Sequence, residues 1–203
     1  QYRAEFGAAD RVLIAVRVKQ GDIFTPEYFK TLKAVTDEVF FLPGVDRASV
    51  RSIFTPNVRF LEIVEGGFAG GDVVPAEFQP TPEGIEIVRQ NILKAGIVGR
   101  LVANDFTAAM VSANLVEIDP ATGQRLDYLK VADELEEKLI ARYAKDNIDI
   151  HIIGFAKAIG DIADGAAGVL TFFAVSFLVT IGLVYLFTHS IVVTLVALFA
   201  SLL

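Results

Sequence analysis

Residues 165–187 read GAAGVLTFFAVSFLVTIGLVYLF, a run of 23 residues without a charged side chain. As a helix rising 1.5 Å per residue, this run is about 34 Å long, enough to cross a hydrocarbon core of about 30 Å. A buried helix of a soluble protein is the alternative, but such helices rarely carry apolar side chains on every face over this length. The stretch therefore predicts a transmembrane helix.

A second apolar run, residues 191–203, follows the short polar sequence Thr188-His189-Ser190. We expect a polar turn here between two membrane helices, the second of them truncated by the end of the sequence. The chain also starts at Gln1 without a leader-like segment. We therefore interpret it as a piece of a longer membrane protein.

All charged residues, 18 Lys and Arg and 25 Asp and Glu, precede residue 165, so the net charge of −7 belongs to residues 1–164. This segment is long enough for one folded domain or two small lobes outside the membrane. Its acidic balance argues against a nucleic-acid partner. The absence of cysteine excludes disulfides and cysteine-based chemistry.

Strand and helix patterns alternate within residues 1–164. A strand over 11–19 precedes a helix that begins at Thr25-Pro26-Glu27 and runs to residue 41, and a strand over 45–54 follows. The later expected elements are a second helix from Thr81-Pro82-Glu83, strands over 98–102 and 107–118, a helix over 127–146 with Leu129, Ala132, Leu135, Leu139 and Tyr143 facing inward, a strand over 148–153, and a helix from 155 into the membrane. This order predicts an α+β fold of the split βαβ (ferredoxin-like) kind.

Glycine and proline interrupt residues 55–80, where we expect a short strand near 59–64 and a flexible loop over about 65–80. The sequence EGGFAGGD, residues 65–72, resembles a phosphate-binding loop in its glycine content only. It lacks the Lys-Ser/Thr ending of a P-loop and the spacing of a dinucleotide fingerprint. A structural loop is the interpretation that remains.

No group of side chains predicts catalysis, a cofactor or a metal site. His151 falls in a strand, and His189 falls in the turn between the apolar runs. Asp161 and Asp164 mark the point where the chain enters the membrane segment. We therefore predict that the chain is not an enzyme and uses no cofactor.

Three stretches together resemble the resistance-nodulation-division superfamily of transporters, most closely its lipid and hydrophobe exporters of the mycobacterial-membrane-protein-large type. They are PEYFKTLKAVTDEVFFLPGVDRASVRSIFT from residue 26, GRLVANDFTAAMVSANL from residue 99, and IDIHIIGFAKAIGDIADGAAGVLTFF from residue 148. The resemblance is one of pattern and covers essentially the whole chain. Relatives often carry an Arg in the turn where this chain has Thr188-His189-Ser190, which is a departure from the family.

The resemblance implies that residues 1–164 form an extracytoplasmic porter domain, and that 165–187 and 191–203 belong to a multi-pass protein of the inner membrane. It implies export of lipids or other hydrophobic or amphiphilic compounds, driven by proton entry through membrane helices outside this sequence. The implied partners are this cargo, the bilayer, the remaining membrane helices of the same chain and further copies in a homo-oligomer.

Two other functions stay open from the sequence. A membrane-anchored extracytoplasmic domain that senses a ligand would continue into a cytoplasmic signalling domain. An accessory subunit of protein export would share the superfamily fold. The sequence beyond residue 203 distinguishes a transporter, which adds membrane helices and a second loop, from a sensor.

Overall fold

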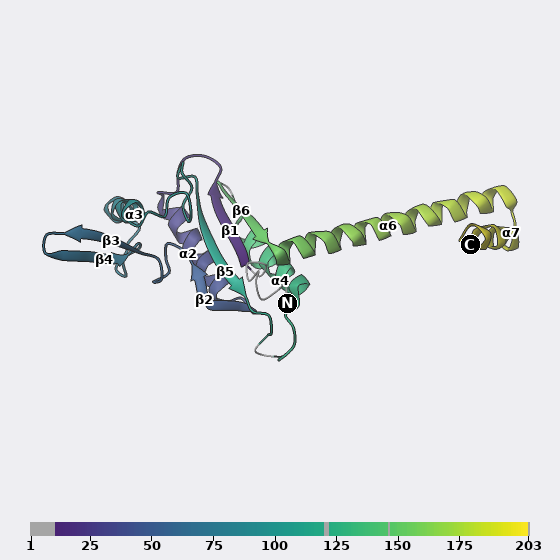
Figure 1. Ribbon diagram of the computed structural model, residues 1–203. Coiled ribbons are helices and arrows are strands. Elements are labelled where there is room, and N and C mark those ends of the chain that lie inside the picture. The colour runs from purple at the N-terminus through teal and green to yellow at the C-terminus, as the bar shows by residue number, and fades with distance from the viewer. Residues whose placement is uncertain (1–10, 120–121, 146, 203) are drawn as a thin grey trace. The chain divides into compact units, whose positions relative to one another are not determined.

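The computed structural model describes residues 11–119, 122–145 and 147–202 (Figure 1). The chain divides into two compact units, Gln1–Gly160 and Asp161–Leu203. The first unit combines helices with antiparallel sheets, which confirms the predicted α+β class.

The elements of the first unit follow the order expected from the sequence in most places. In chain order they are β1 (Arg11–Val18), α2 (Pro26–Phe41), β2 (Val45–Arg51), β3 (Arg59–Val64), β4 (Gly67–Asp72), α3 (Pro82–Lys94), β5 (Ala108–Leu115), α4 (Tyr128–Leu135), the π-helix η1 (Glu136–Ile140), α5 (Ala141–Tyr143) and β6 (Ile148–Gly154), followed by the start of α6 (Phe155–Thr188).

A four-stranded sheet organises this unit, with the strand order β2-β5-β1-β6. Each neighbouring pair is antiparallel, and Ile14 of β1 pairs with Val111 of β5 on one side and with Ile152 of β6 on the other. Helix α2 connects β1 to β2, which run in the same direction with β5 between them. The helices from α4 to α5 connect β5 to β6 across β1 in the same manner.

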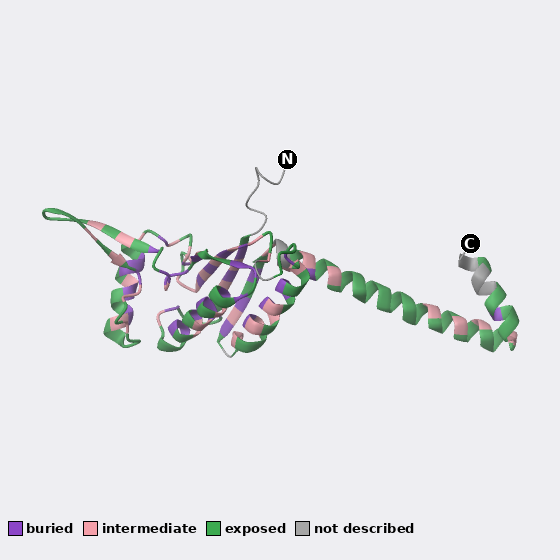
Figure 2. Ribbon diagram, turned by 90° about the horizontal axis from the view of Figure 1, so that it is seen from below, coloured by how far each residue is buried: buried purple, intermediate pink, exposed green. Residues whose placement is uncertain are grey.

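The core lies between one face of this sheet and its helices. Alternate residues of β1 (Val12, Ile14 and Val16) are fully buried, as period-2 geometry requires. Helix α2 contributes the buried residues Phe29 and Leu32, and the burial of each stabilises the fold by about 1.5–3 kcal/mol. Figure 2 shows the helices on one side of the sheet, with buried residues between the two layers.

Both Thr-Pro-Glu sequences begin helices, as predicted. The Oγ1 atom of Thr25 accepts a hydrogen bond from the Tyr28 backbone N–H at 3.3 Å, and Oγ1 of Thr81 accepts from that of Gly84 at 3.2 Å. Each threonine thereby satisfies one donor that the first helical turn leaves without a partner.

Two local predictions are wrong. Part of the expected loop over 65–80 is strand β4, which pairs with β3 in a hairpin; Gly66 at φ 94° makes the turn that permits it. The expected strand over 98–102 is a tight turn with two isolated bridges, one between Val98 and Val102 and one between Val102 and Ala109 of β5.

The helix predicted over 127–146 begins at its cap Asp127 but contains the π-helix η1. The wider π turn holds about one residue more than an α turn, so it changes which side chains after it face inward. Ala132, Leu135 and Leu139 are buried as predicted. Leu129 is 43% exposed instead of facing inward, because it lies beside the stripe formed by Val131, Ala132 and Leu135.

The second unit consists of the later part of α6 and helix α7 (Ile191–Leu202). Among the described residues, one helix, Lys157–Thr188, is long and apolar enough to cross a membrane. Helix α7 has 12 described residues, about 18 Å, and is shorter than the ~20 residues that a full span needs.

The turn between α6 and α7 has its own hydrogen bonds. His189 adopts a positive φ of 48°, and the hydroxyls of Thr188 and Thr194 lie 3.1 Å apart. Thr194 also donates to the Ser190 carbonyl at 2.9 Å. These local bonds satisfy the hydroxyl groups inside an otherwise apolar segment.

Candidate functional site

The second face of the four-stranded sheet faces away from α2 and α4. Residues Arg11, Leu13, Ala15 and Arg17 of β1 alternate with the core residues and therefore point to this free face. Strand β5 presents Met110, Ser112 and Asn114 there by the same alternation. The free face thus carries a mixture of apolar, polar and basic side chains.

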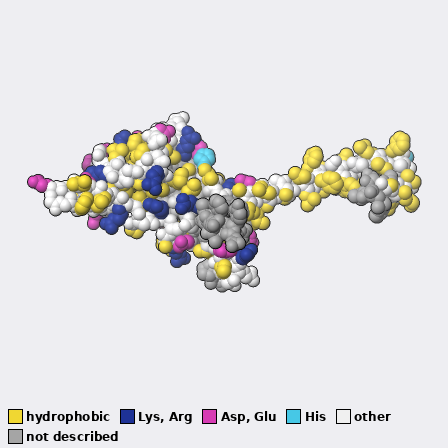
Figure 3. All heavy atoms as spheres, in the orientation of Figure 1, with side chains coloured by type: hydrophobic (Ala, Val, Ile, Leu, Met, Phe, Trp, Pro, Cys, Tyr) yellow, Lys and Arg dark blue, Asp and Glu magenta, His cyan; other side chains and the backbone are white. Residues whose placement is uncertain are grey.

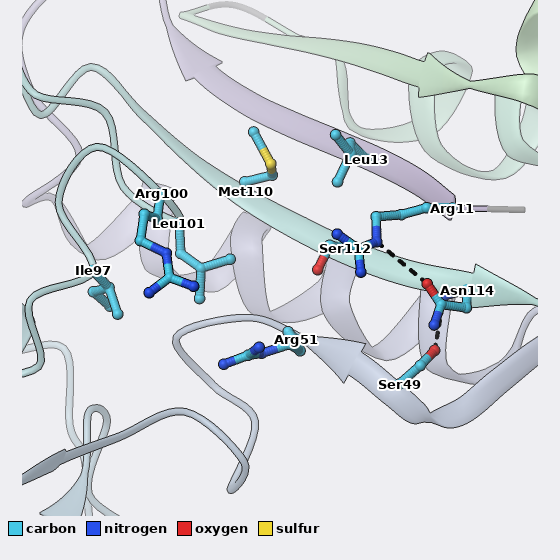
Figure 4. Close-up of a pocket in the computed structure, with 10 residues that line it drawn as sticks. All are labelled: Arg11, Leu13, Ser49, Arg51, Ile97, Arg100, Leu101, Met110, Ser112 and Asn114. Carbon is cyan, nitrogen blue, oxygen red and sulfur yellow. Dashed lines mark hydrogen bonds between the residues drawn. The ribbon is translucent and has the colours of Figure 1, made fainter. Parts of the chain in front are cut away.

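A cavity of about 560 Å³ lies on the free face, within the first unit (Figure 4). Its size is within the range of ~300–1,000 Å³ typical of small-molecule sites. Three strands and the turn after α3 line it: Arg11 and Leu13 from β1, Ser49 and Arg51 from β2, Met110, Ser112 and Asn114 from β5, and Ile97, Arg100 and Leu101 from the turn.

Pairing across the sheet explains why these residues meet. Ser112 pairs with Leu13 on one side and with Arg51 on the other, so the three occupy one row across β2, β5 and β1. The register of β2 shifts between Asp46 and Arg51, which brings Arg51 into this row. Such irregularities redirect side chains at sheet edges.

The apolar part of the cavity comes from Leu13, Met110, Ile97 and Leu101. The turn is fixed to the sheet because the Met110 N–H donates to the Leu101 carbonyl at 2.8 Å. Ile97 is only 9% exposed and packs into the core below it. This side of the cavity is therefore attached both to the sheet and to the core.

The basic part consists of three arginines, Arg11, Arg51 and Arg100, all exposed. Arg11 Nε donates to Asn114 Oδ1 at 3.4 Å, and the Asn114 backbone N–H donates to Ser49 Oγ at 2.8 Å. Among the described residues no aspartate or glutamate lines the cavity. Figure 3 shows a group of Lys and Arg side chains near the middle of one face of the first unit, with hydrophobic side chains beside it.

A second region of interest is the junction of β6 and α6. Gly154 lies so close to β1 that a Cβ there would be 2.8 Å from the Arg11 carbonyl oxygen. Helix α6 follows immediately at residue 155. Lys157 forms an ion pair with Glu136 of η1, and a Cβ at Gly160 would be 2.8 Å from the Ala132 Cβ. The first turns of α6 therefore pack against the helix that covers the sheet.

The pKa values of three groups outside the cavity, Tyr28, Asp105 and Tyr143, are shifted, and the causes are clearest for the first two. Burial raises the pKa of the Tyr28 phenol well above its ordinary value of 10.0, and the hydrogen bond from the Ala109 N–H opposes this in part. Hydrogen bonds from Thr107 lower the pKa of Asp105, and they run from its hydroxyl at 2.8 Å and its N–H at 3.1 Å. Both groups have structural roles, the first in the core and the second in a turn.

The polar residues singled out from the sequence do not form one site. His151 is exposed on β6, opposite Ala15, and is outside the cavity lining. His189 lies in the turn before α7, and Asp161 and Asp164 are exposed on α6. Over the described ranges, no three His, Asp or Glu side chains are grouped to hold a metal ion.

Sequence reasoning did not find the arginine cavity. The available signal was the alternation of a strand over 11–19, which puts Arg11 and Leu13 on the same face. The contributions of Arg51 and Arg100 depend on a register shift and on a turn, and neither has a sequence pattern.

Comparison with known proteins adds no family: no family model matches the chain, and no curated protein is significantly similar to it.

Proposed function

We propose that the chain is part of an inner-membrane transporter of the resistance-nodulation-division type that exports lipids or other hydrophobic or amphiphilic compounds. Residues 1–164 are its extracytoplasmic porter domain, and the apolar segments belong to a multi-pass membrane domain. Proton entry through further membrane helices drives export.

The direct junction of β6 with α6 carries this proposal. A strand of the ligand-facing sheet continues without a loop into the helix that is long enough to cross a membrane. The ion pair of Lys157 with Glu136 connects the same helix to η1, and the close approach of Gly160 to Ala132 connects it to α4. A movement of the helix in the membrane would thereby reach the sheet and its cavity.

The strand order supports the finer fold assignment. In the order β2-β5-β1-β6, the unit β1-α2-β2 leaves β5 between its two strands, and the unit that runs from β5 through α4 to β6 leaves β1 between its two strands. This is the split βαβ arrangement expected of a porter lobe. The β3–β4 hairpin and α3 are inserted between β2 and β5. We assign the porter lobe to the four-stranded sheet and its two covering helices.

The test is export by the complete encoded protein in proteoliposomes that contain a fluorescent amphiphile, with and without a proton gradient. Proline at Ala158, an exposed position in the first turns of α6, should abolish gradient-dependent export because it breaks the helix between β6 and the membrane. Leucine at Ala158 keeps the helix and should preserve export. Equal export by the proline and leucine variants would contradict the proposal, and so would export that does not depend on the proton gradient.

The second candidate is a membrane-anchored ligand sensor. The observation that favours it is the cavity of the first unit, in a domain that continues directly into a helix long enough to anchor it in a membrane. A sensor would bind ligand in the cavity of the first unit without moving it across the bilayer. Binding without export in the same proteoliposomes is the result that would select it.

A further inference from the structure

We propose that the cavity on the free face of the sheet binds an anionic amphiphile, meaning an alkyl chain that ends in a carboxylate, phosphate or sulfate. The arginines hold the anionic group, and the apolar lining contacts the chain. As a statement about cargo this rests on the proposed function, but the binding itself can be tested separately.

The charges of the cavity lining favour an anion. Several other arginines of the first unit have partners: Arg59 pairs with Asp72 at 3.5 Å, Arg142 pairs with Glu38 at 2.6 Å, and Arg89 lies 4.7 Å from the centre of the Phe24 ring. Within the described part of the chain, neither Arg51 nor Arg100 has a carboxylate or a ring as a partner. Both line the same cavity with Arg11.

An anion that enters between three cations facing one cavity is attracted by each of them. Guanidinium groups also match the geometry of carboxylate and phosphate oxygens and can bind them through paired hydrogen bonds. Figure 4 shows these side chains reaching the cavity from three separate segments, β1, β2 and the turn at residue 100. The chain as a whole has a net charge of −7, but the three arginines make the cavity locally positive. The cavity therefore favours a negatively charged group.

The apolar lining favours an alkyl chain beside the anionic group. Leu13 and Met110 lie on neighbouring strands, and Leu101 is held over β5 by its bond to Met110. Together with Ile97 they provide a wall for an alkyl chain next to the arginines. Met110 adds an unbranched, adaptable side chain, which suits ligands of variable chain length.

The composition of the lining also argues against a polyanion such as nucleic acid. Among the described residues no aromatic side chain lines the cavity, so there is no platform on which bases could stack. The remaining polar groups, Ser49, Ser112 and Asn114, are small and lie within the row between the arginines. They can add hydrogen bonds to a compact head group.

The experiment uses the full chain in phosphatidylcholine nanodiscs and two photoreactive probes, a dodecanoic acid and a dodecanol that carry the same diazirine in the chain. We expect the acid to label the peptides that contain Leu101 and Met110, and the alcohol to label them about tenfold less. Replacing Arg51 and Arg100 together by glutamine should remove this difference. Their replacement by lysine should retain much of it, because the positive charges remain.

The matched control replaces two exposed arginines outside the cavity, Arg47→Gln with Arg125→Gln, and should label as the unmodified chain does. Far-UV circular dichroism of each variant establishes that it is folded. Equal labelling by acid and alcohol in the unmodified chain would overturn the inference. So would undiminished acid labelling in the folded glutamine variant, or complete displacement of the probe by inorganic phosphate alone.

The outcome also separates this inference from the proposed function. Gradient-driven export without preference for the acid overturns the anionic site and leaves the transporter. Acid-selective labelling without export overturns the transporter and leaves the anionic site.

Discussion

Tyr28 of α2 connects the helix layer to the centre of the sheet. Its hydroxyl donates to the Val16 carbonyl and accepts from the Ala109 N–H, both at 2.7 Å, and Val16 and Ala109 are partners in the β1–β5 register. Tyr28→Phe leaves both backbone groups buried without this partner. We expect a loss of about 1–3 kcal/mol in the free energy of unfolding, measured by urea titration in mild detergent.

Tyr143→Phe is the control for this prediction. Its hydroxyl donates to Glu38 at 3.2 Å near the surface, where water can replace the bond, so its loss should be much smaller. Equal effects of the two substitutions would show that the Tyr28 hydroxyl has no special role in the sheet.

The raised pKa of Tyr28 also makes stability depend on pH. In the unfolded chain the phenol loses its proton near pH 10.0, whereas in the folded chain burial raises the pKa and keeps it protonated. The stabilisation is therefore complete below pH 10 and declines as pH rises above it, by up to about 1.4 kcal/mol per pH unit. The difference in unfolding free energy between the unmodified chain and Tyr28→Phe should shrink over this range; a constant difference would contradict the shift.

At the scale of elements, the contact between α4 and the start of α6 depends on small residues. A side chain at Gly160 would meet Ala132, since even a Cβ there lies 2.8 Å from the Ala132 Cβ. Gly160→Leu should cost about 1–3 kcal/mol through overpacking and should increase hydrogen exchange of α4. Gly165→Leu, in the same helix but with no atom within 4 Å of a Cβ, should leave that exchange unchanged.

Elements with a strong local signal could be predicted from the sequence, and those set by non-local pairing could not. The Thr-Pro-Glu sequences located the starts of α2 and α3 because a helix cap is a signal that lies within one helical turn. Strand β4 was missed because GFAGGD has few side chains that favour a strand, and only pairing with β3 fixes it. The cavity escaped prediction for the same reason, since it requires β2 to pair with β5.

At the scale of the whole molecule, the membrane assignment depends on the apolar surface of α6. Phe172 is 76% exposed and Leu178 is 66% exposed, as expected of side chains that face lipid. Leu178→Arg should reduce insertion by about 2.5–3.5 kcal/mol, measured as the fraction of chain that resists alkaline extraction from membranes. Leu61→Arg, at a position 67% exposed in the first unit, should not change that fraction, and an equal loss would contradict a spanning helix.

The β3–β4 hairpin is a part of the first unit that can unfold locally while the rest stays folded. It forms a separate two-stranded sheet, and its described ties to α3 include the ion pair of Glu62 with Lys94 and the contact of Lys94 with the Phe60 ring. A lone hairpin has little independent stability, so it opens far more often than the four-stranded sheet. A protease added at low concentration should therefore cut first near Glu65-Gly66, yielding two fragments that stay together through the intact core.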